Sequence, residues 1–589
     1  MTDSSLPRAQ RPGDFTADWR ILLLMGVAVV VGAGAVGTAW ILLKLIALCT
    51  DLAYYGRFST EVLTPAGASP GWWAVPIPVA GCLIIGLMAR YGSEKIRGHG
   101  IPEAIEAIMI GKSRISPKVA VLKPLSSAIS IGTGGPFGAE GPIIMTGGAV
   151  GSLLAQMIHL SSTERKALLV AGAAAGMTAI FGTPLAAVLL AVELLLFELR
   201  PRSFLPVVVA VAVAATVRGY VLDGAPLFPF AGVMNASLPA LLSWGAVGVL
   251  AGLASGVLTA MVYGSEDAFL KLPIHWMWWP LLGGLAVGLG GMIDPSVLGV
   301  GYDNIRHLLS GEMLGRAALM LLVVKAVVWA LALGSGTSGG VLAPLLIFGG
   351  CIGALASPVL PEAAPGFWPL LGMAAMMGGT MRAPLTATLF AVELTGDTGA
   401  VLPLLAACGM AHATTVLLLK RSILTEKIAR RGLHITREYQ TDPFDLAWVK
   451  DVMVPEVDVV PAAWTVGETT DFFLSGERRH KSYPVVDAER RVIGMVSRAD
   501  ILDWMRDKNA MDRKAPLAEL VSRSDLVSSH PDELVGRLAD RMAQSGAGRV
   551  PVLDKDGRLI GLVARKDLLV ARSRRQAEER DHAVMLRLR

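Results

Sequence analysis

Long apolar runs are the feature that most constrains how this chain folds. Residues 21–48, 241–263, 317–333 and 401–419 each form a run close to the roughly 20 residues that cross a bilayer. Shorter apolar stretches are cut by Gly and Pro, namely 103–111, 118–131, 141–158, 163–181 and 184–198. Because polar backbone at membrane depth is costly unless it lines a cavity, such breaks indicate an interior site. The pattern predicts a polytopic α-helical membrane protein with many tilted and broken helices.

Charge is distributed unevenly between a body and a tail. The chain holds 53 Lys+Arg and 48 Asp+Glu, and residues 441–589 contain 25 of each, which leaves 51 charges for the first 440 residues. This contrast is typical of a membrane part followed by a water-soluble part. The net charge of +5 shows no basic stripe and so gives no case for a nucleic-acid partner. The four cysteines are scattered singly, which indicates neither a disulfide framework nor a metal site.

The basic residues that flank the apolar body predict its orientation. A polar segment, residues 1–19, carries Arg8 and Arg11, and five basic residues follow the last apolar run: Lys420, Arg421, Lys427, Arg430 and Arg431. By the positive-inside rule both termini are expected in the cytoplasm, which requires an even number of crossings. Composition and short loops favour a bacterial inner membrane.

The apolar body contains an internal repeat. Residues 181–194 align with 381–394 at an offset of 200, and both end in Ala-Val-Glu-Leu. Pro142 with Gly147, Gly148 and Gly151 recurs at an offset of 202 as Pro344 with Gly349, Gly350 and Gly353. The repeat predicts two halves, about 20–220 and 239–433, with a substrate site at their junction. The alternative is duplication of a purely structural unit.

Three segments rich in glycine and proline, residues 98–102, 134–142 and 334–344, each open an apolar run. Glycine followed by proline suits a helix start whose free N–H groups must approach a ligand closely. Several such starts converging at low dielectric could hold an anion without a lysine. The alternative is that the glycines serve only tight helix packing.

These motifs resemble those of the CLC chloride channels and chloride/proton exchangers, over roughly residues 20–433. Residues 98–102 resemble the family's GSGIP segment, 138–142 its GKEGP or GREGP segment, and 340–344 its GxFxP segment. The resemblance implies two inverted halves and a homodimer, in a lipid bilayer, with one pore per subunit for chloride or a similar small anion. It implies that helix N-termini and backbone amides hold the anion at Gly98, His99, Gly100, Ile101, Pro102, Gly138, Ala139, Gly141, Pro142, Gly340, Val341, Leu342, Ala343, Pro344 and Leu424.

Glu140 is the strongest single candidate for a functional side chain. An ionisable group within the membrane is expensive and functional by default, and a carboxylate beside anion-binding amides can compete with the anion for them. The resemblance implies that this glutamate gates the pore. The alternative is a helix-capping glutamate at a membrane surface. For Glu193 and Glu393, which close the two repeats, a structural helix-end hydrogen bond or salt bridge is the favoured interpretation.

Four positions depart from the family pattern. His99 replaces a serine that helps to coordinate the central anion, Leu424 replaces a tyrosine, and Leu342 replaces a phenylalanine. The inner proton-passing glutamate of the exchangers falls on Leu194, which cannot carry a proton. This favours passive, channel-like conduction, with a chloride/proton antiporter as the alternative. Because the reference pKa of histidine is about 6.5, His99 is hypothesised to line the path and make transport pH-sensitive; the alternative is an inert histidine at the mouth.

The charged tail contains a second repeat, in which residues 483–502 align with 550–569 at an offset of 67. Each unit reads as strand, turn, strand and helix, and resembles a CBS domain. We expect a linker at 434–449, an α/β cytoplasmic pair at 450–508 and 517–572, and a charged tail at 573–589. The resemblance leaves an adenine nucleotide as a candidate ligand at Ser497, Asp500 and Asp567, against a purely structural pair.

The sequence thus predicts a gated chloride transport protein that requires no cofactor and is not an enzyme. The resemblance implies chloride over fluoride, because 138–142 keeps the proline of the family's chloride movers where its fluoride branch usually has threonine. A remoter alternative is a CBS-regulated cation transporter, such as one for magnesium, which would need several carboxylates or carbonyl rings along its path.

Overall fold

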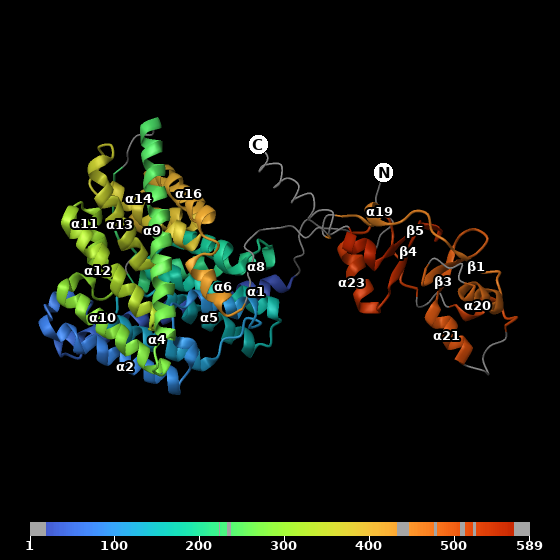
Figure 1. Ribbon diagram of the computed structural model, residues 1–589, viewed down its shortest axis with the longest axis horizontal. Coiled ribbons are helices and arrows are strands. Elements are labelled where there is room, and N and C mark those ends of the chain that lie inside the picture. The colour runs from blue at the N-terminus through green and yellow to red at the C-terminus, as the bar shows by residue number, and fades with distance from the viewer. Residues whose placement is uncertain are drawn as a thin grey trace. The chain divides into compact units, whose positions relative to one another are not determined.

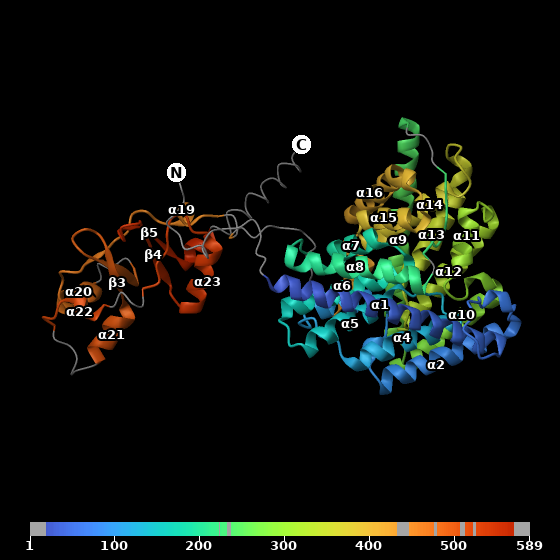
Figure 2. The same ribbon diagram turned by 180° about the vertical axis from the view of Figure 1, so that it is seen from behind.

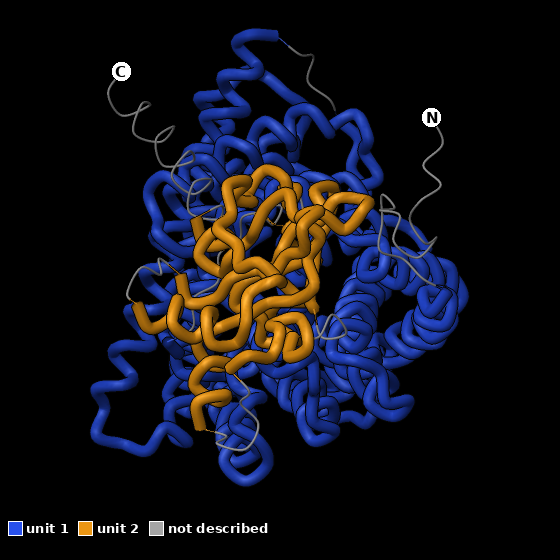
Figure 3. The backbone as a smooth tube through the Cα atoms, turned by 90° about the vertical axis from the view of Figure 1, so that its right-hand side faces the viewer, with its two compact units in different colours: residues 1–438 blue, residues 439–589 orange. Residues whose placement is uncertain are grey.

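The computed structural model forms two compact units, Met1–Glu438 and Tyr439–Arg589 (Figures 1 and 3). The structure describes residues 19–222, 224–232, 237–432, 444, 447–475, 480–506, 513–521 and 526–570. The predicted N-terminal segment 1–19 and linker 434–449 fall mostly outside the described residues, and the predicted tail 573–589 falls wholly outside them.

The described residues of the first unit form helices joined by short segments. The first half ends with α8, and the second half begins with α9. The first half contains α1 (Arg20–Thr50), η2 (Asp51–Tyr55), η3 (Ala66–Ala68), η4 (Gly71–Ala74), α2 (Pro76–Tyr91), η5 (Glu94–Ile96), α3 (Ile101–Met109), α4 (Pro117–Gly132), α5 (Glu140–Met157), α6 (Ser162–Phe181), α7 (Pro184–Leu190), η6 (Ala191–Leu196) and α8 (Pro201–Val221). The second half contains α9 (Leu238–Leu270), η7 (Trp276–Trp278), α10 (Trp279–Ile293), η8 (Pro295–Val297), α11 (Tyr302–Leu309), α12 (Gly315–Gly334), α13 (Leu342–Ala356), η9 (Ser357–Val359), α14 (Phe367–Met381), α15 (Pro384–Thr395), η10 (Thr398–Ala400), α16 (Val401–Leu418) and α17 (Ile423–Arg430).

The predicted mixture of spanning and broken helices is confirmed. Eight helical segments among the described residues are long and apolar enough to cross a membrane, including α1 and the 33-residue α9. Others are too short, such as the nine-residue α3 and the seven-residue α7, which continues into a π-helical turn. The first N–H groups of a helix have no partner within the helix, so short helices place unpaired donors inside the unit. Such donors are what the predicted anion site requires.

Glycines bring the helices of each half into close contact in the same way. A Cβ on Gly147 of α5 would lie 2.3 Å from the carbonyl oxygen of Gly172 on α6. In the second half a Cβ on Gly349 of α13 would lie 2.1 Å from that of Gly372 on α14. For these glycines, therefore, tight helix packing is the correct interpretation.

The two repeats also cap one another. Glu393 of α15 accepts hydrogen bonds from the backbone N–H groups of Leu185 and Ala186 at 2.9 and 2.8 Å. Glu193 of η6 accepts from the backbone of Leu385 and from the backbone and hydroxyl of Thr386. Each glutamate thus caps the helix start of the opposite half, where α7 and α15 lie side by side (Figure 2). The structural interpretation of Glu193 and Glu393 is confirmed.

The second unit contains two small sheets with helices. Strands β1 (Val460–Pro461), β2 (Ser482–Val486) and β3 (Val492–Ser497) form one sheet, and β4 (Arg549–Leu553) and β5 (Leu559–Ala564) the other. The helices are α19 (Val449–Val452), α20 (Val466–Leu474), α21 (Arg498–Arg506), α22 (Leu517–Leu520) and α23 (Val535–Ser545). Tyr483 pairs with Val496, and Val550 pairs with Val563, at the predicted offset of 67. The predicted α/β repeat is confirmed.

Candidate anion site

Glu140 is the first residue of α5 and is fully buried. Its Oε1 accepts a hydrogen bond from the backbone N–H of Ala343 at 3.2 Å, near the start of α13. Its Oε2 has no hydrogen-bond partner among the described residues. The carboxylate therefore connects the helix starts of the two halves while keeping one oxygen unpaired, an expensive arrangement in a fold without a function for it.

Two glycines make room for this carboxylate. Gly138 and Gly340 form a short antiparallel bridge, with N–H to carbonyl distances of 3.1 and 2.8 Å. A Cβ on Gly138 would lie 1.7 Å from Glu140 Oε2, and a Cβ on Gly340 would lie 2.5 Å from it. Any side chain at either position would have to displace the Glu140 carboxylate.

The first motif meets the other two at the same place. A Cβ on Gly141 would lie 1.8 Å from the carbonyl oxygen of His99, and one on Gly100 would lie 2.5 Å from that of Gly141. The Gly98 N–H donates to the carbonyl of Thr337, which lies within the third segment, 334–344. The structure thus brings all three predicted segments together, with Ile101 and Pro102 opening α3, Ala139 and Pro142 flanking the start of α5, and Val341, Leu342 and Pro344 at the start of α13.

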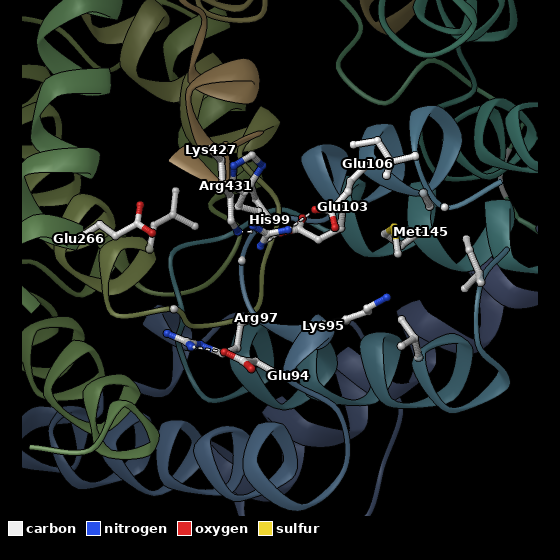
Figure 4. A pocket seen from close by; sticks show the side chains of 18 of the residues that line it. Glu94, Lys95, Arg97, His99, Glu103, Glu106, Met145, Glu266, Lys427 and Arg431 are labelled. Carbon is white, nitrogen blue, oxygen red and sulfur yellow. Dashed lines mark hydrogen bonds and ion pairs between the residues drawn. The ribbon is translucent and has the colours of Figure 1, made fainter. Parts of the chain in front are cut away.

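His99 is 3% exposed and lines a cavity of about 530 Å³, whose walls also include Gly98 of the first motif and Gly334 of the third (Figure 4). Its Nδ1 has no hydrogen-bond partner among the described residues. The cavity walls also carry many charged side chains: Glu94, Lys95, Arg97, Glu103, Glu106, Arg114, Glu266, Lys427 and Arg431. The side chain of His99 therefore belongs to the wall of a charged cavity that adjoins the first motif.

Sequence reasoning missed the ion pairs that hold this cavity together. Glu103 of α3 lies 2.7 Å from the Nζ of Lys427 on α17, and Arg431 pairs with Glu106. Glu103 also accepts from the Gly100 N–H at 2.9 Å, which caps α3. In the sequence Glu103 follows the first motif directly and Glu106 lies three residues further on, but neither position reveals that its partner lies at Lys427 or Arg431.

Leu424 and Leu194, two of the positions that depart from the family pattern, are apolar and fully buried, as is Leu342. Leu424 lies in the first turn of α17, where the Tyr263 hydroxyl of α9 donates to the neighbouring carbonyl of Ile423. Leu194 lies in the π-helical turn η6, among the hydrophobic side chains of the core. Neither side chain can accept or donate a proton.

In the second unit the predicted nucleotide residues act as helix caps. Asp500 Oδ2 accepts from the backbone N–H and the hydroxyl of Ser497, both at 2.7 Å. Asp567 Oδ2 accepts from the Ala564 N–H at 2.8 Å. The two aspartates occupy equivalent places after β3 and β5.

An apolar repeat of broken helices, in which the starts of α5 and α13 meet at one buried carboxylate, is typical of a class, the membrane proteins that move anions. The family model described as "Voltage gated chloride channel" matches residues 81–416, and the CBS domain model matches 449–507 and 517–574. The chain belongs to the voltage-gated chloride channel (CLC) family and carries two CBS domains.

Curated relatives bear the names of both channels and exchangers. The chain is 31% identical over 384 residues to a "Putative chloride channel protein ClcB-like" of Ralstonia nicotianae, covering 63% of this chain and 88% of the relative. It is 29% identical over 425 residues to the "Voltage-gated ClC-type chloride channel ClcB" of Salmonella typhimurium, covering 69% and 98%. It is 28% identical over 379 residues to the "H(+)/Cl(-) exchange transporter ClcA" of the same organism, covering 61% and 79%.

Solved structures show the same fold. A "slow cyanobacterial Cl-/H+ antiporter" superposes with a TM-score of 0.62 at 22% identity, covering 71% of this chain and 99% of that one. "A eukaryotic CLC transporter" superposes with a TM-score of 0.57 at 20% identity, covering 93% and 98%. At these identities the comparison supports the fold alone.

Proposed function

We propose that the protein moves chloride across a bacterial inner membrane and that Glu140 is its gate. The observation that carries the proposal is the position of the Glu140 carboxylate, held between Gly138 and Gly340 with the Ala343 N–H bonded to it. A carboxylate there occupies the place that helix N-termini offer to an anion, so protonation or displacement of Glu140 would open the path. Chloride is supported by the family match and by the names of the relatives.

We favour passive conduction because Leu194 stands at the inner proton position and is buried among apolar side chains. A chloride/proton antiporter is the second candidate, since a ClcA relative is named as an exchanger. An antiporter would need another inner group to carry the proton.

Reconstitution in liposomes under a chloride gradient, with protons and chloride recorded together, tests the mechanism. Passive conduction predicts chloride flux without uphill proton movement, and coupled proton uptake would rule it out. Glu140→Ala should abolish gating in either mechanism, whereas Glu312→Ala, an exposed carboxylate, should leave it intact. Unchanged gating in Glu140→Ala would remove Glu140 from the proposed role.

His99 is proposed to couple transport to pH because its buried ring lines the cavity. Burial most of all, and then Lys427, Lys123 and Arg431, lower the pKa of the His99 ring to about 3, and Glu103 opposes this shift. We therefore expect any effect of His99 on transport to appear at a pH below about 6.5, the ordinary pKa of histidine. His99→Ser should flatten the pH profile or change anion selectivity, and a variant that matched the wild type in both would exclude the role.

The CBS pair is proposed to bind an adenine nucleotide through Asp500 and Asp567, which lie at equivalent helix starts. Calorimetry of residues 440–589 with ATP, ADP and AMP tests this. Heat of binding that falls in Asp500→Ala, but not in Asp503→Ala on the exposed side of α21, would support it. No heat with any of the three would leave the pair a structural role.

We also propose a homodimer with one pore per subunit and with both termini in the cytoplasm. The basic residues that follow α16 and the family match support this arrangement. A mass measurement of the purified protein in detergent, and labelling of cysteines introduced near each terminus in intact cells, test the two statements. A monomeric mass, or labelling of either terminus from outside, would contradict them.

A further inference from the structure

Two buried lysines occupy equivalent places in the two halves. Lys123 of α4 is 1% exposed and donates to the carbonyls of Ile96 and Gly98 at 2.8 and 2.6 Å. Lys325 of α12 is fully buried and donates to the carbonyls of Val297 and Gly299 at 2.8 and 3.3 Å. The lysines are 202 residues apart, and their carbonyl partners are 201 apart. The Lys123 partners belong to the first anion motif or lie just before it.

The turns that these lysines hold also match. Gly98 and Gly100 have φ of 87° and 90°, and Gly299 and Gly301 have φ of 69° and 83°. After the first turn α3 begins at Ile101, and after the second α11 begins at Tyr302. The segment 299–303 is therefore the repeat counterpart of the first anion motif, although it lacks the proline by which such motifs stand out in the sequence.

Donors gather around this second turn. A Cβ on Gly301 would lie 3.1 Å from both Lys325 Nζ and Asn304 Nδ2. The Tyr302 hydroxyl is buried without a partner among the described residues, and burial together with the Glu140 carboxylate raises its pKa. The Gly299 N–H donates to the carbonyl of Gly134, in the segment that leads to Glu140. This turn therefore lies beside the second anion motif.

The charge on Lys325 is not explained by packing. No carboxylate forms an ion pair with it among the described residues, and two carbonyls use only two of its three donors. Asp294 acts on this ammonium only at longer range, and a buried ammonium with no carboxylate in contact is expensive unless an anion offsets it part of the time. The Tyr302 hydroxyl, which also lacks a hydrogen-bond partner among the described residues, is a second donor available to an anion at this place.

We propose that Lys325, Asn304, Tyr302 and the N-terminus of α11 form a further station for a small monovalent anion. Because the halves are inverted, this station serves the mouth on the opposite side of Glu140 from the His99 cavity. This inference rests on the proposed chloride transport. It adds a site that binds the anion on the second side before the anion reaches Glu140. Lys123 is its counterpart at the first mouth.

The test measures chloride flux in liposomes while chloride is varied on one side at a time. Lys325→Met should raise half-saturating chloride roughly tenfold on one side only, as expected for the loss of a charge-assisted contact. Lys123→Met should raise it on the other side, whichever way the protein is oriented. Lys118→Met, an exposed lysine on the same helix as Lys123, is the matched control and should change neither side.

A second measurement does not depend on whether the lysine variants fold. Bromide soaked into crystals of the wild-type protein should give anomalous density beside Gly301 and Tyr302, and Tyr302→Phe should weaken it. Bromide near Glu140 but none at α11, or equal changes on both sides in Lys325→Met, would overturn the inference while leaving the proposed function intact. A failure of the proposed function would appear separately, as flux indifferent to Glu140→Ala.

Discussion

At the scale of single residues, the Glu140 carboxylate leaves no room for a side chain at position 340, which explains why a glycine stands there. A Cβ there would lie 2.5 Å from Glu140 Oε2 and 2.6 Å from the Gly138 carbonyl oxygen. We expect Gly340→Ala to cost about 1–3 kcal/mol of stability through overpacking and to release flux from its dependence on Glu140. Gly264→Ala, where a Cβ meets nothing within 4 Å, is the control. Thermal unfolding and flux of both variants give the comparison, and wild-type gating in Gly340→Ala would show that the carboxylate lies elsewhere.

Glu468 gives a pH prediction at the same scale. The N–H and hydroxyl of Thr465 donate to Glu468 Oε2 at 2.7 and 3.0 Å, and these bonds hold the pKa of Glu468 below its usual value. Because the folded pKa is lowered, the cap stabilises α20 above the unfolded value of about 4.3 and is lost as pH falls through the folded value. Glu468→Ala should lower the unfolding temperature of residues 439–589 at pH 7, and the difference should vanish in acid. Exposed Glu489→Ala should match the wild type throughout, and an equal loss there would exclude a specific cap.

At the scale of elements, the glutamate caps link the two halves. Glu393 bonds to two N–H groups of α7, so Glu393→Leu would leave them unpaired next to a buried helix end. We expect a loss of about 1–3 kcal/mol, and a similar loss for Glu193→Leu. Glu362→Leu, on an exposed segment of the same half, should change stability by less than about 0.5 kcal/mol. The free energy of unfolding of each variant, measured with denaturant in detergent, tests this expectation. Wild-type values for both cap variants would mean that other contacts hold α7 to α15.

The elements also show what the sequence could and could not predict. Gly and Pro spacing identified the three helix starts and Glu140, since helix termini have local chemical signatures. The turn before α11 was missed because it lacks the proline of the other motifs, and Lys325 was missed because a lysine in an apolar run does not reveal which carbonyl it reaches. The Glu103–Lys427 pair joins α3 to α17 across more than 300 residues, so only the packed structure shows it.

At the scale of the whole molecule, the two units keep separate hydrophobic cores. The large core of the first unit ends with Ile428, and the cores of the second draw only on Phe444 and later residues. Because no described core cluster crosses from one unit to the other, a chain ending at residue 438 is expected to fold. It should conduct with the same dependence on Glu140, within about twofold of the full chain.

Any effect of adenine nucleotides on flux should be absent in that truncated chain, because the equivalent helix starts at Asp500 and Asp567 lie wholly in the second unit. We would measure chloride flux of the full and truncated chains, with and without ATP, and again in their Glu140→Ala variants. These measurements separate gating by Glu140 from regulation by the nucleotide. An effect of ATP that persists without residues 439–589 would place the nucleotide in the membrane unit. A truncated chain that loses its Glu140 dependence would show that the gate needs the second unit, even though the carboxylate, the glycines around it and the N–H group it accepts all belong to the first.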